Sequence, residues 1–200
     1  MEFSVEYMKR WLSANRRRYF DWGVLIALIV TMFWLLSNFI APFLASPGTI
    51  DLGEDGVTGR LSTLENNGEE IAQIDNDYAR AVYNAGDANC HQHASRSFFL
   101  NDNQMPFCAR CTAIFLGVVI GVAILMFLVI ELNIWMLLLG LVPMGLDGGI
   151  QLLTDYESNN LFRFITGTIA GITAGLALGY IISEIGHEIV IRRKIRKGSE

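Results

Sequence analysis

The sequence predicts an all-α fold: a polytopic four-helix bundle in a membrane, with a long extracytoplasmic loop that contains an amphipathic helix. Hydrophobic residues make up 52% of the 200 residues, and the mean hydropathy is positive, as is typical of membrane proteins. The apolar residues are gathered into four nearly uncharged runs, each of about 18 residues or more, the length that a helix needs to cross a bilayer. These runs have too little polar surface to belong to a soluble core. They span residues 22–43, 112–130, 134–153 and 164–185.

The distribution of charge predicts which way the bundle faces. Five basic residues precede the first run and five follow the last, whereas the 45–111 connection holds ten acidic residues and four arginines. Because basic flanks favour the cytoplasmic side, we expect a multi-pass protein of the cell membrane with both termini in the cytoplasm. The basic ends suit anionic lipid of the bilayer, and nothing in the sequence indicates nucleic acid binding. The long loop and all three cysteines then lie outside the cytoplasm.

The first half of the chain should contain a surface segment, a span and the loop. Residues 1–21 are predicted to form a basic amphipathic segment on the cytoplasmic surface, and the alternative is the charged flank of a signal anchor. Residues 22–43 form transmembrane helix 1, which is too long for the apolar core of a cleaved signal peptide. In the extracytoplasmic loop, residues 44–111, apolar residues at helical spacing predict one amphipathic helix that begins near Glu69 and ends before Gly86.

Residues 112–185 are predicted to form transmembrane helices 2–4, followed by a cytoplasmic basic tail at 186–200. The second and fourth spans carry small residues at every fourth position, which lets helix backbones approach closely in lipid. We therefore expect the fourth span to be central, and the same faces would suit contacts between copies in an oligomer. Only residues 131–133 separate the second and third spans, which predicts a tight antiparallel hairpin. The small residues are Ala113, Gly117, Gly121, Gly167, Gly171, Gly175 and Gly179.

The three cysteines and two of the three histidines gather just before the second span. Cys108 and Cys111 lie one turn apart at a predicted helix start, where unsatisfied N–H groups and the helix dipole lower the pKa of a thiol. Together with Cys90 and either His91 or His93, they predict a Cys₃His metal site, for which zinc is the natural ion. The alternative of packing cysteines without a ligand stays open.

A redox pair is a further alternative for the same thiols. Cys108 and Cys111 form a C-x-x-C motif that could cycle between dithiol and disulfide, with Cys90 as the exchange partner and a quinone as the electron acceptor. Four-helix membrane thiol oxidases look like this in outline. They generally use two cysteine pairs, and three cysteines cannot make two pairs, so the metal site is the first prediction.

A second polar cluster is expected at the same membrane face. Asp147 and Gln151 lie four residues apart on one face of the third span, in its outer part, and Asn160 and Arg163 follow at the start of the fourth span. Ionisable residues within a span are costly and mark functional sites. One interpretation is an Asp147–Arg163 ion pair that fixes helix register. The other is a catalytic pocket in which Asp147 is a general base or metal-site partner and Arg163 holds an anion.

Two more arginines lie close in sequence to the thiols. Arg96 and Arg110 offer guanidinium donors that would suit a phosphate or carboxylate headgroup. We therefore predict that they bind substrate. The alternative is that they pair with the acidic residues of the loop.

These residues form a pattern that runs across residues 90–180. It reads Cys90-His91-Gln92, Arg96-Ser97-Phe98, Pro106-x-Cys108-x-Arg110-Cys111-Thr112, Asp147-Gly148-x-x-Gln151 and Asn160-x-x-Arg163-x-x-Thr166-Gly167. The pattern resembles a family of prokaryotic membrane proteins, the domain of unknown function 2085. Ala113 departs from the glycine that is usual after the threonine, but a small residue is kept. His93 is outside the family signature, so the resemblance favours His91 as the histidine ligand. It implies a four-helix membrane protein and supplies no activity.

The sequence therefore predicts an integral membrane protein with a zinc site of Cys90, His91, Cys108 and Cys111 beside a polar pocket. The first functional hypothesis is a metal-dependent enzyme that acts on a lipid-like or other anionic substrate. The alternatives are a thiol-disulfide oxidoreductase that uses a quinone and a non-enzymatic interaction module with a structural zinc. We expect all these residues to meet at one outward-facing end of the bundle.

Overall fold

The structure is a computed structural model that describes residues 21–53, 67–128, 130 and 132–197. The predicted basic segment at 1–21 lies outside the described residues, except for Asp21. The Asp21 carboxylate accepts a hydrogen bond from the Val24 N–H at 3.2 Å and so caps the first long helix.

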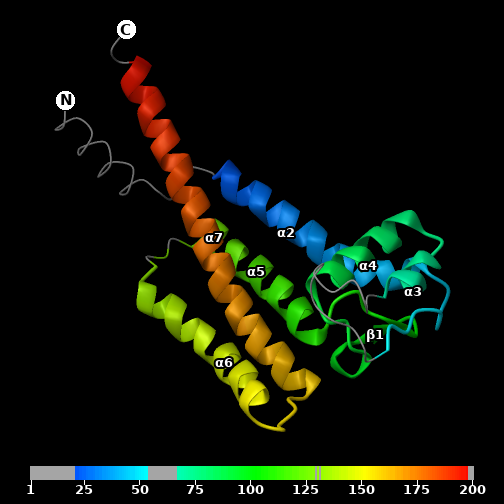
Figure 1. The fold of residues 1–200 in the computed structure, drawn as a ribbon. Coiled ribbons are helices and arrows are strands. Elements are labelled where there is room, and N and C mark those ends of the chain that lie inside the picture. Colours follow the sequence, from blue (N-terminus) through cyan, green and yellow to red (C-terminus); the bar gives the residue numbers. More distant parts are fainter. Residues whose placement is uncertain (1–20, 54–66, 129, 131, 198–200) are drawn as a thin grey trace.

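Among the described residues, four helices are long and apolar enough to cross a membrane, which confirms the all-α fold class and the number of predicted spans (Figure 1). Two of them begin earlier than predicted: the second at Ala109 instead of residue 112, and the fourth at Asn160 instead of residue 164. Their added first turns carry several of the predicted site residues. The helices are α2 (Trp22–Ile40, continued by the 3₁₀ turn η2, Ala41–Leu44), α5 (Ala109–Phe127), α6 (Ile134–Leu153) and α7 (Asn160–Lys197).

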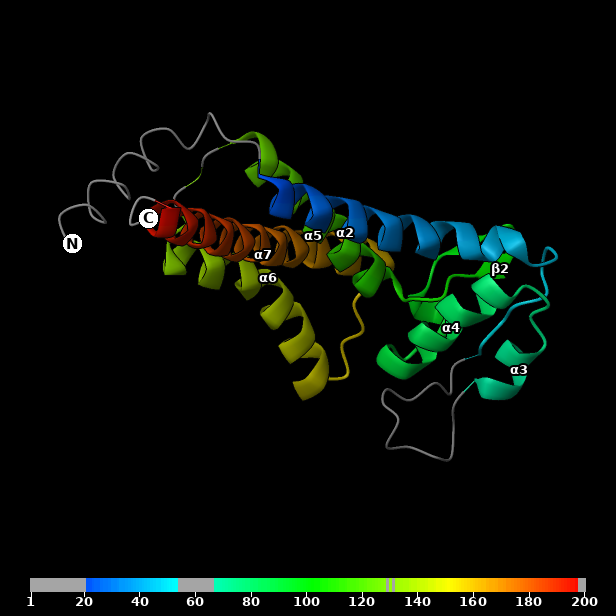
Figure 2. The same cartoon turned by 90° about the horizontal axis from the view of Figure 1, so that it is seen from above.

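The predicted central position of the fourth span is confirmed, because α7 packs on each of the other three long helices, most extensively on α5 (Figures 1 and 2). The expected tight hairpin of the second and third spans is wrong. Helix α6 packs along α7, and α2 lies mainly against α5. A short connection brings two helix ends together, but the side chains along the helices decide which faces pack.

Glycines explain why α5 and α7 are neighbours. A Cβ atom at Gly117 would overlap the Thr168 carbonyl oxygen of α7, and one at Gly171 would overlap the Ile114 carbonyl oxygen of α5. The two backbones therefore touch where both helices lack side chains, which is how helices associate in lipid. These contacts lie within one chain, so an oligomer formed through glycine-rich faces stays a prediction.

The loop after α2 folds into a small subdomain beside the end of α2 and the start of α5 (Figure 2). The one amphipathic helix that we expected there is two, because the Asn76 side chain accepts a hydrogen bond from the Ala79 N–H at 2.9 Å and starts a new helix. Gly86 lies inside the second helix and not after its end. The subdomain contains α3 (Gly68–Ala72), α4 (Asp77–Asn89), the 3₁₀ turn η3 (Ala94–Arg96), β1 (Phe99–Leu100) and β2 (Asn103–Gln104).

The subdomain has its own apolar core, which lies under η2, α3 and α4. The largest fully buried side chains of this core are Tyr83 and Ile71. Strands β1 and β2 form an antiparallel hairpin that the sequence analysis did not predict. Its two loop residues, Asn101 and Asp102, have positive φ angles of 55° and 57°, as a type I′ turn requires and as these residue types tolerate.

Candidate functional site

The three cysteine sulfurs lie within 4.8 Å of one another, at the junction between the subdomain and the bundle. Cys90 caps the end of α4 and is buried, while Cys108 caps the start of α5 and Cys111 lies in its first turn. All three are free thiols. Tetrahedral zinc with bonds of about 2.3 Å places its sulfur ligands about 3.8 Å apart. The sulfurs therefore form a group that could hold a metal ion.

Gly86 and Gln92 fix the position of Cys90. The Cys90 N–H donates to the Gly86 carbonyl at 2.7 Å. A Cβ atom at Gly86 would overlap the Pro106 carbonyl oxygen, so only glycine lets α4 approach the segment that leads into Cys108. Gln92 is fully buried and donates from Nε2 to the same Pro106 oxygen at 2.8 Å. This packing holds the chain before α5 against the end of α4.

The start of α5 favours the thiolate of Cys108. Hydrogen bonds from the Cys111 and Cys90 thiols, and then from the backbone N–H groups of Cys111 and Arg110, lower the pKa of Cys108 to about 2. Sharing a hydrogen bond with Cys108 raises the pKa of Cys90 to about 11. In addition, the Cys108 N–H donates to the Cys90 sulfur at 3.3 Å. The predicted helix start is therefore present, and its N–H groups favour Cys108 as the thiolate of the three sulfurs.

The two histidines lie next to the thiols but are not part of the group of sulfurs. Their rings are 5.7 Å apart between centroids. Burial, followed by the positive charge of His93, lowers the pKa of His91, while the negative charge of Cys108 opposes the shift. A lowered pKa keeps the His91 imidazole neutral, which is the form that ligates metal. His91 as fourth ligand stays a prediction, as does the choice between His91 and His93.

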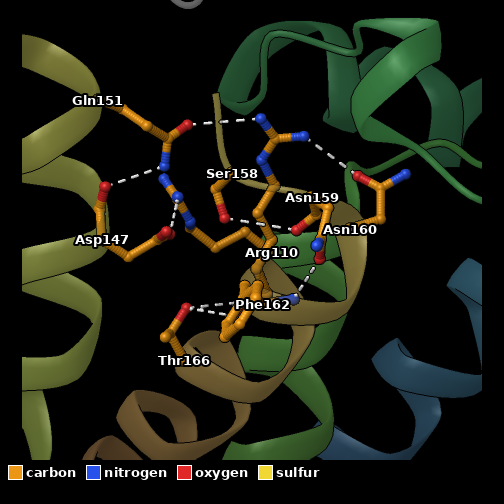
Figure 3. A network of polar contacts seen from close by, with 9 residues as sticks. Arg110, Asp147, Gln151, Ser158, Asn159, Asn160, Phe162 and Thr166 are labelled. Carbon is orange, nitrogen blue, oxygen red and sulfur yellow. Dashed lines mark hydrogen bonds and ion pairs between the residues drawn. The ribbon is translucent and has the colours of Figure 1, made fainter. Parts of the chain in front are cut away.

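The second polar cluster joins α5, α6 and α7 (Figure 3). The expected Asp147–Arg163 ion pair is wrong, because the Asp147 carboxylate pairs with Arg110 instead. The Asp147 side chain is 9% exposed and that of Arg110 27%. The Asp147 side chain faces α5 across the bundle. Its backbone carbonyl accepts a hydrogen bond from Gln151 Nε2 at 2.9 Å. The pair ties α6 to the turn of α5 that carries the cysteines.

Arg163 is buried in the first turn of α7 and bonds to neutral groups. It donates from Nη1 to Asn160 Oδ1 at 3.2 Å and from Nη2 to Gln151 Oε1 at 3.4 Å. Asn160 in turn donates to the backbone carbonyls of Ser95 at 3.2 Å and Ser97 at 3.4 Å. The start of α7 is thereby attached to the η3 segment that follows the histidines.

Arg96 pairs with an acidic residue, but one outside the loop whose acidic residues the alternative named. Its Nη2 lies 2.8 Å from Glu157 Oε1 in the turn between α6 and α7, and the side chains are 36% and 71% exposed. An exposed pair of this kind adds little to stability. Glu157 thus reaches from the turn between α6 and α7 to the subdomain.

The structure therefore brings the predicted residues to one end of the bundle. Arg110 follows Cys108 in the chain and precedes Cys111, so the sulfurs and the arginine share one helical turn. The Arg110–Asp147 ion pair and the bonds of Asn160 and Arg163 bring in α6 and α7. The predicted convergence of the thiols and the intramembrane aspartate at the same end is confirmed, whereas the catalytic and substrate-binding roles stay predictions.

The sequence analysis missed several buried amides that support the site. Asn38, in the apolar α2, donates to the Thr112 hydroxyl at 2.9 Å. Gln104 accepts from the Leu52 N–H at 2.8 Å, and Asn103 accepts from the Ile50 N–H at 2.9 Å. An amide inside an apolar span is a recognisable signal that would have found Asn38. Gln104 and Asn103 have no comparable signal, because polar residues are ordinary in a loop.

Comparisons with known proteins agree with the geometry of the site. The family described as a predicted membrane protein, domain of unknown function 2085, matches residues 90–177, which include every residue of the two clusters. No solved structure matches the chain.

Two archaeal relatives are similar to the chain, and both are described as uncharacterized. A protein of Methanocaldococcus jannaschii is 36% identical over 155 residues, which cover 74% of this chain and 85% of the relative. A protein of Methanothermobacter thermautotrophicus is 37% identical over 92 residues, which cover 44% of this chain and 81% of the relative. The match in sequence, the four apolar helices and the cluster at their common end together show that this chain belongs to the domain of unknown function 2085 family of membrane proteins.

Proposed function

We propose that the protein is a membrane metalloprotein that binds zinc through Cys90, Cys108 and Cys111 at the extracytoplasmic end of the bundle. The observation that carries the proposal is the grouping of the three sulfurs within 4.8 Å. Thiolates favour zinc over the harder divalent cations. A buried Cys90 and two partly exposed cysteines at a helix start give a site that a metal can reach from one side.

The fourth coordination position decides whether the zinc is structural or catalytic. His91 would close the site as a structural one, joining the subdomain to α5. With His91 away, zinc would keep an open position, at which it activates water in catalytic sites. We propose His91 as the fourth ligand, because it follows Cys90 directly in the chain and burial lowers the pKa of its imidazole, which favours the neutral form that ligates metal.

The polar cluster would supply the rest of a binding pocket for a lipid-like or anionic substrate. The ion pair with Arg110 supports a positioning role for Asp147, because its carboxylate is already engaged by a guanidinium group. Gln151, Asn160 and Arg163 form a connected set beside it, and Arg96 and Arg110 provide further guanidinium groups.

Metal analysis of the purified, full-length protein tests the proposal. We expect about one zinc per chain in the wild type, in line with one site of three or four ligands, and loss of that zinc in Cys108→Ser. His91→Ala should weaken zinc binding roughly tenfold or more if His91 is the fourth ligand. His93→Ala is the matched control and should keep the wild-type affinity.

The opposite result has a definite meaning. The zinc proposal would be overturned if the purified protein contained no metal and carried a Cys108–Cys111 disulfide. Reduction of that disulfide by dithiothreitol and its re-formation with a quinone would favour the thiol-disulfide oxidoreductase. The interaction module with a structural zinc would be supported by two results together. The protein would hold zinc tightly, and neither Asp147→Asn nor Gln151→Ala would change any measured turnover.

A further inference from the structure

We propose that the outer end of the bundle binds a phosphate-type anion through Arg96, Arg110 and Arg163, which we name the arginine cluster. This inference deepens the proposed function by naming the chemistry of its ligand, but none of the three arginines is a proposed metal ligand. Among the described residues, two carboxylates pair with the cluster: Glu157 with Arg96 and Asp147 with Arg110. Three guanidinium groups face two carboxylates, which leaves one positive charge in excess.

The excess charge belongs to Arg163. The residue is 5% exposed, and its guanidinium group donates hydrogen bonds at 3.2 and 3.4 Å to the neutral side chains of Asn160 and Gln151. Within the described part of the chain, no carboxylate oxygen lies within 4.0 Å of its guanidinium nitrogens. The charges of Arg96 and Arg110 repel it, and the carboxylates of Glu157 and Asp147, which pair with those arginines, attract it only from a longer distance. A buried arginine ordinarily has an anionic partner, and this one lacks a partner from those residues.

Arg110 supplies a second unused donor. Its Nη2 binds Asp147, but its Nε is buried and has no hydrogen-bond partner among the described residues. A guanidinium group has five N–H donors in a fixed fork that matches the oxygens of phosphate. Asp147 satisfies one edge of Arg110, so donor capacity remains in the same cluster as Arg163.

The position of Arg163 strengthens the attraction for an anion. It lies in the first turn of the 38-residue helix α7, where the helix dipole is positive and acidic side chains are normally favoured. The Asn159 side chain already caps this turn by accepting from the Phe162 N–H at 2.9 Å. An arginine at such a place adds to the positive potential instead of neutralising it, so the local field favours a bound anion.

The position of the arginine cluster along the span of α7 indicates the source of the anion. The candidate span of α7 begins at Asn160, so the arginine cluster lies where a bilayer has its headgroups. Apolar side chains around it are turned outward: Leu153 is 84% exposed, Leu161 66% and Ile165 47%. These side chains would lie along acyl chains while the cluster meets a headgroup phosphate.

Phosphate fits the cluster better than a carboxylate does. A carboxylate has two oxygens, which one guanidinium fork can satisfy. A phosphate ester presents more acceptor oxygens and can bridge two arginines at once. The chemistry is shared by an anionic phospholipid and by free phosphate, which the experiment separates.

Isothermal titration calorimetry of the full-length protein in detergent tests the inference. The probes are inorganic phosphate, short-chain phosphatidic acid and, as the uncharged-headgroup comparison, short-chain phosphatidylcholine. If the protein binds phosphatidic acid but not inorganic phosphate, the ligand is a lipid headgroup. If it binds both, free phosphate is sufficient as the ligand. Absence of binding by both anionic probes, or equal binding of phosphatidylcholine, overturns the inference.

The variants compare two arginines of the same helix. Arg163→Gln should raise the Kd of the bound anion at least tenfold. Arg192→Gln, at the other end of α7 and paired with Glu188 at 3.1 Å, is the matched control and should leave the Kd within twofold of the wild type. An unchanged Kd in Arg163→Gln, or an equal rise in Arg192→Gln, overturns the inference.

Two further measurements separate this result from folding and from the metal. Arg163→Lys keeps the positive charge but loses the forked guanidinium group. It should raise the Kd of the anion at least threefold, while its unfolding midpoint stays at the wild-type value. A wild-type Kd in Arg163→Lys overturns the inference even if Arg163→Gln fails to fold. Zinc content should be unchanged in both Arg163 variants. If the wild-type protein is free of metal as purified and still binds the anion, the zinc proposal is contradicted and the arginine cluster is supported.

Discussion

At the scale of single residues, the first turn of α5 serves two clusters at once. Successive residues of a helix point about 100° apart, so Cys108 and Cys111 share one side of the turn while Arg110 points away from them. The sulfurs thereby face Cys90 at the end of α4, and the guanidinium group faces Asp147 on α6. The short motif Cys108-Ala109-Arg110-Cys111 thus joins the subdomain to the third span.

Gly86 offers a residue-scale prediction. Gly86→Ala should destabilise the protein by about 1–3 kcal/mol and weaken zinc binding, because the added methyl group would overlap the Pro106 carbonyl and push α4 away from α5. The measurement is the free energy of reversible unfolding in mixed micelles, together with metal content. Asn84→Ala, on the exposed side of α4, should stay within about 0.5 kcal/mol of the wild type. Equal stability of the two variants would show that this contact does not set the position of Cys90.

The sequence predicted the thiol group because spacing along a helix is a local property. It failed on the partner of Asp147, since that choice depends on which helix lies opposite α6, and apolar spans have no pattern that selects their neighbours. Arg110 lies in a turn that we placed in the loop, so its reach into the bundle was not evident. Likewise, the capping role of Asn76, which divides the amphipathic segment into two helices, depends on one side-chain hydrogen bond.

At the scale of helices, the four spans differ sharply in how firmly they are held. Helices α5 and α7 touch through their glycines, whereas none of the residues of α6, all of which the structure describes, is buried. Helix α6 is held by its packing on α7 and by the ion pair near its C-terminal end. Gly140 of α6 faces the Thr173 side chain of α7, which is the closest glycine contact between these two helices.

A pair of glycine substitutions tests this difference between the helices. Gly171→Ala should destabilise the bundle by about 1–3 kcal/mol, because its Cβ would overlap the Ile114 carbonyl of α5. Gly149→Ala in α6 has no atom within 4 Å of the added Cβ and should be neutral or stabilising by about 0.4–1 kcal/mol, as for alanine at an open helical site. Unfolding in mixed micelles measures both. Similar stabilities would mean that the α5–α7 contact is not a tight one.

At the scale of the whole molecule, three observations combine into one architecture. The long helices alternate in direction and the subdomain covers one end (Figures 1 and 2). Both polar clusters lie at that end. The composition predicted the membrane class and the helix count because hydrophobic length is read directly from sequence. The subdomain could not be predicted in the same way, because its core and its buried amides join residues that are far apart in the chain.

The orientation of the molecule in the membrane is a prediction at this scale. We expect a green fluorescent protein fused to the C-terminus to be fluorescent, since it would stay in the cytoplasm, and alkaline phosphatase fused after residue 75 to be active, since it would lie outside. Fusion of alkaline phosphatase to the C-terminus is the matched control and should be inactive. The reverse pattern of activities would place the cysteines in the cytoplasm and remove the extracytoplasmic part of the proposed function.

The unbroken length of α7 has a mechanical consequence. Its 38 residues form a rod of about 57 Å at about 1.5 Å per residue, roughly twice the thickness of the hydrocarbon layer. With the Arg163 end near the headgroups, as the proposed anion site requires, the rod projects well beyond the opposite leaflet. A stiff rod pivots as a unit, so a small tilt at the occupied end sweeps the far tip through a larger arc on the other side of the bilayer.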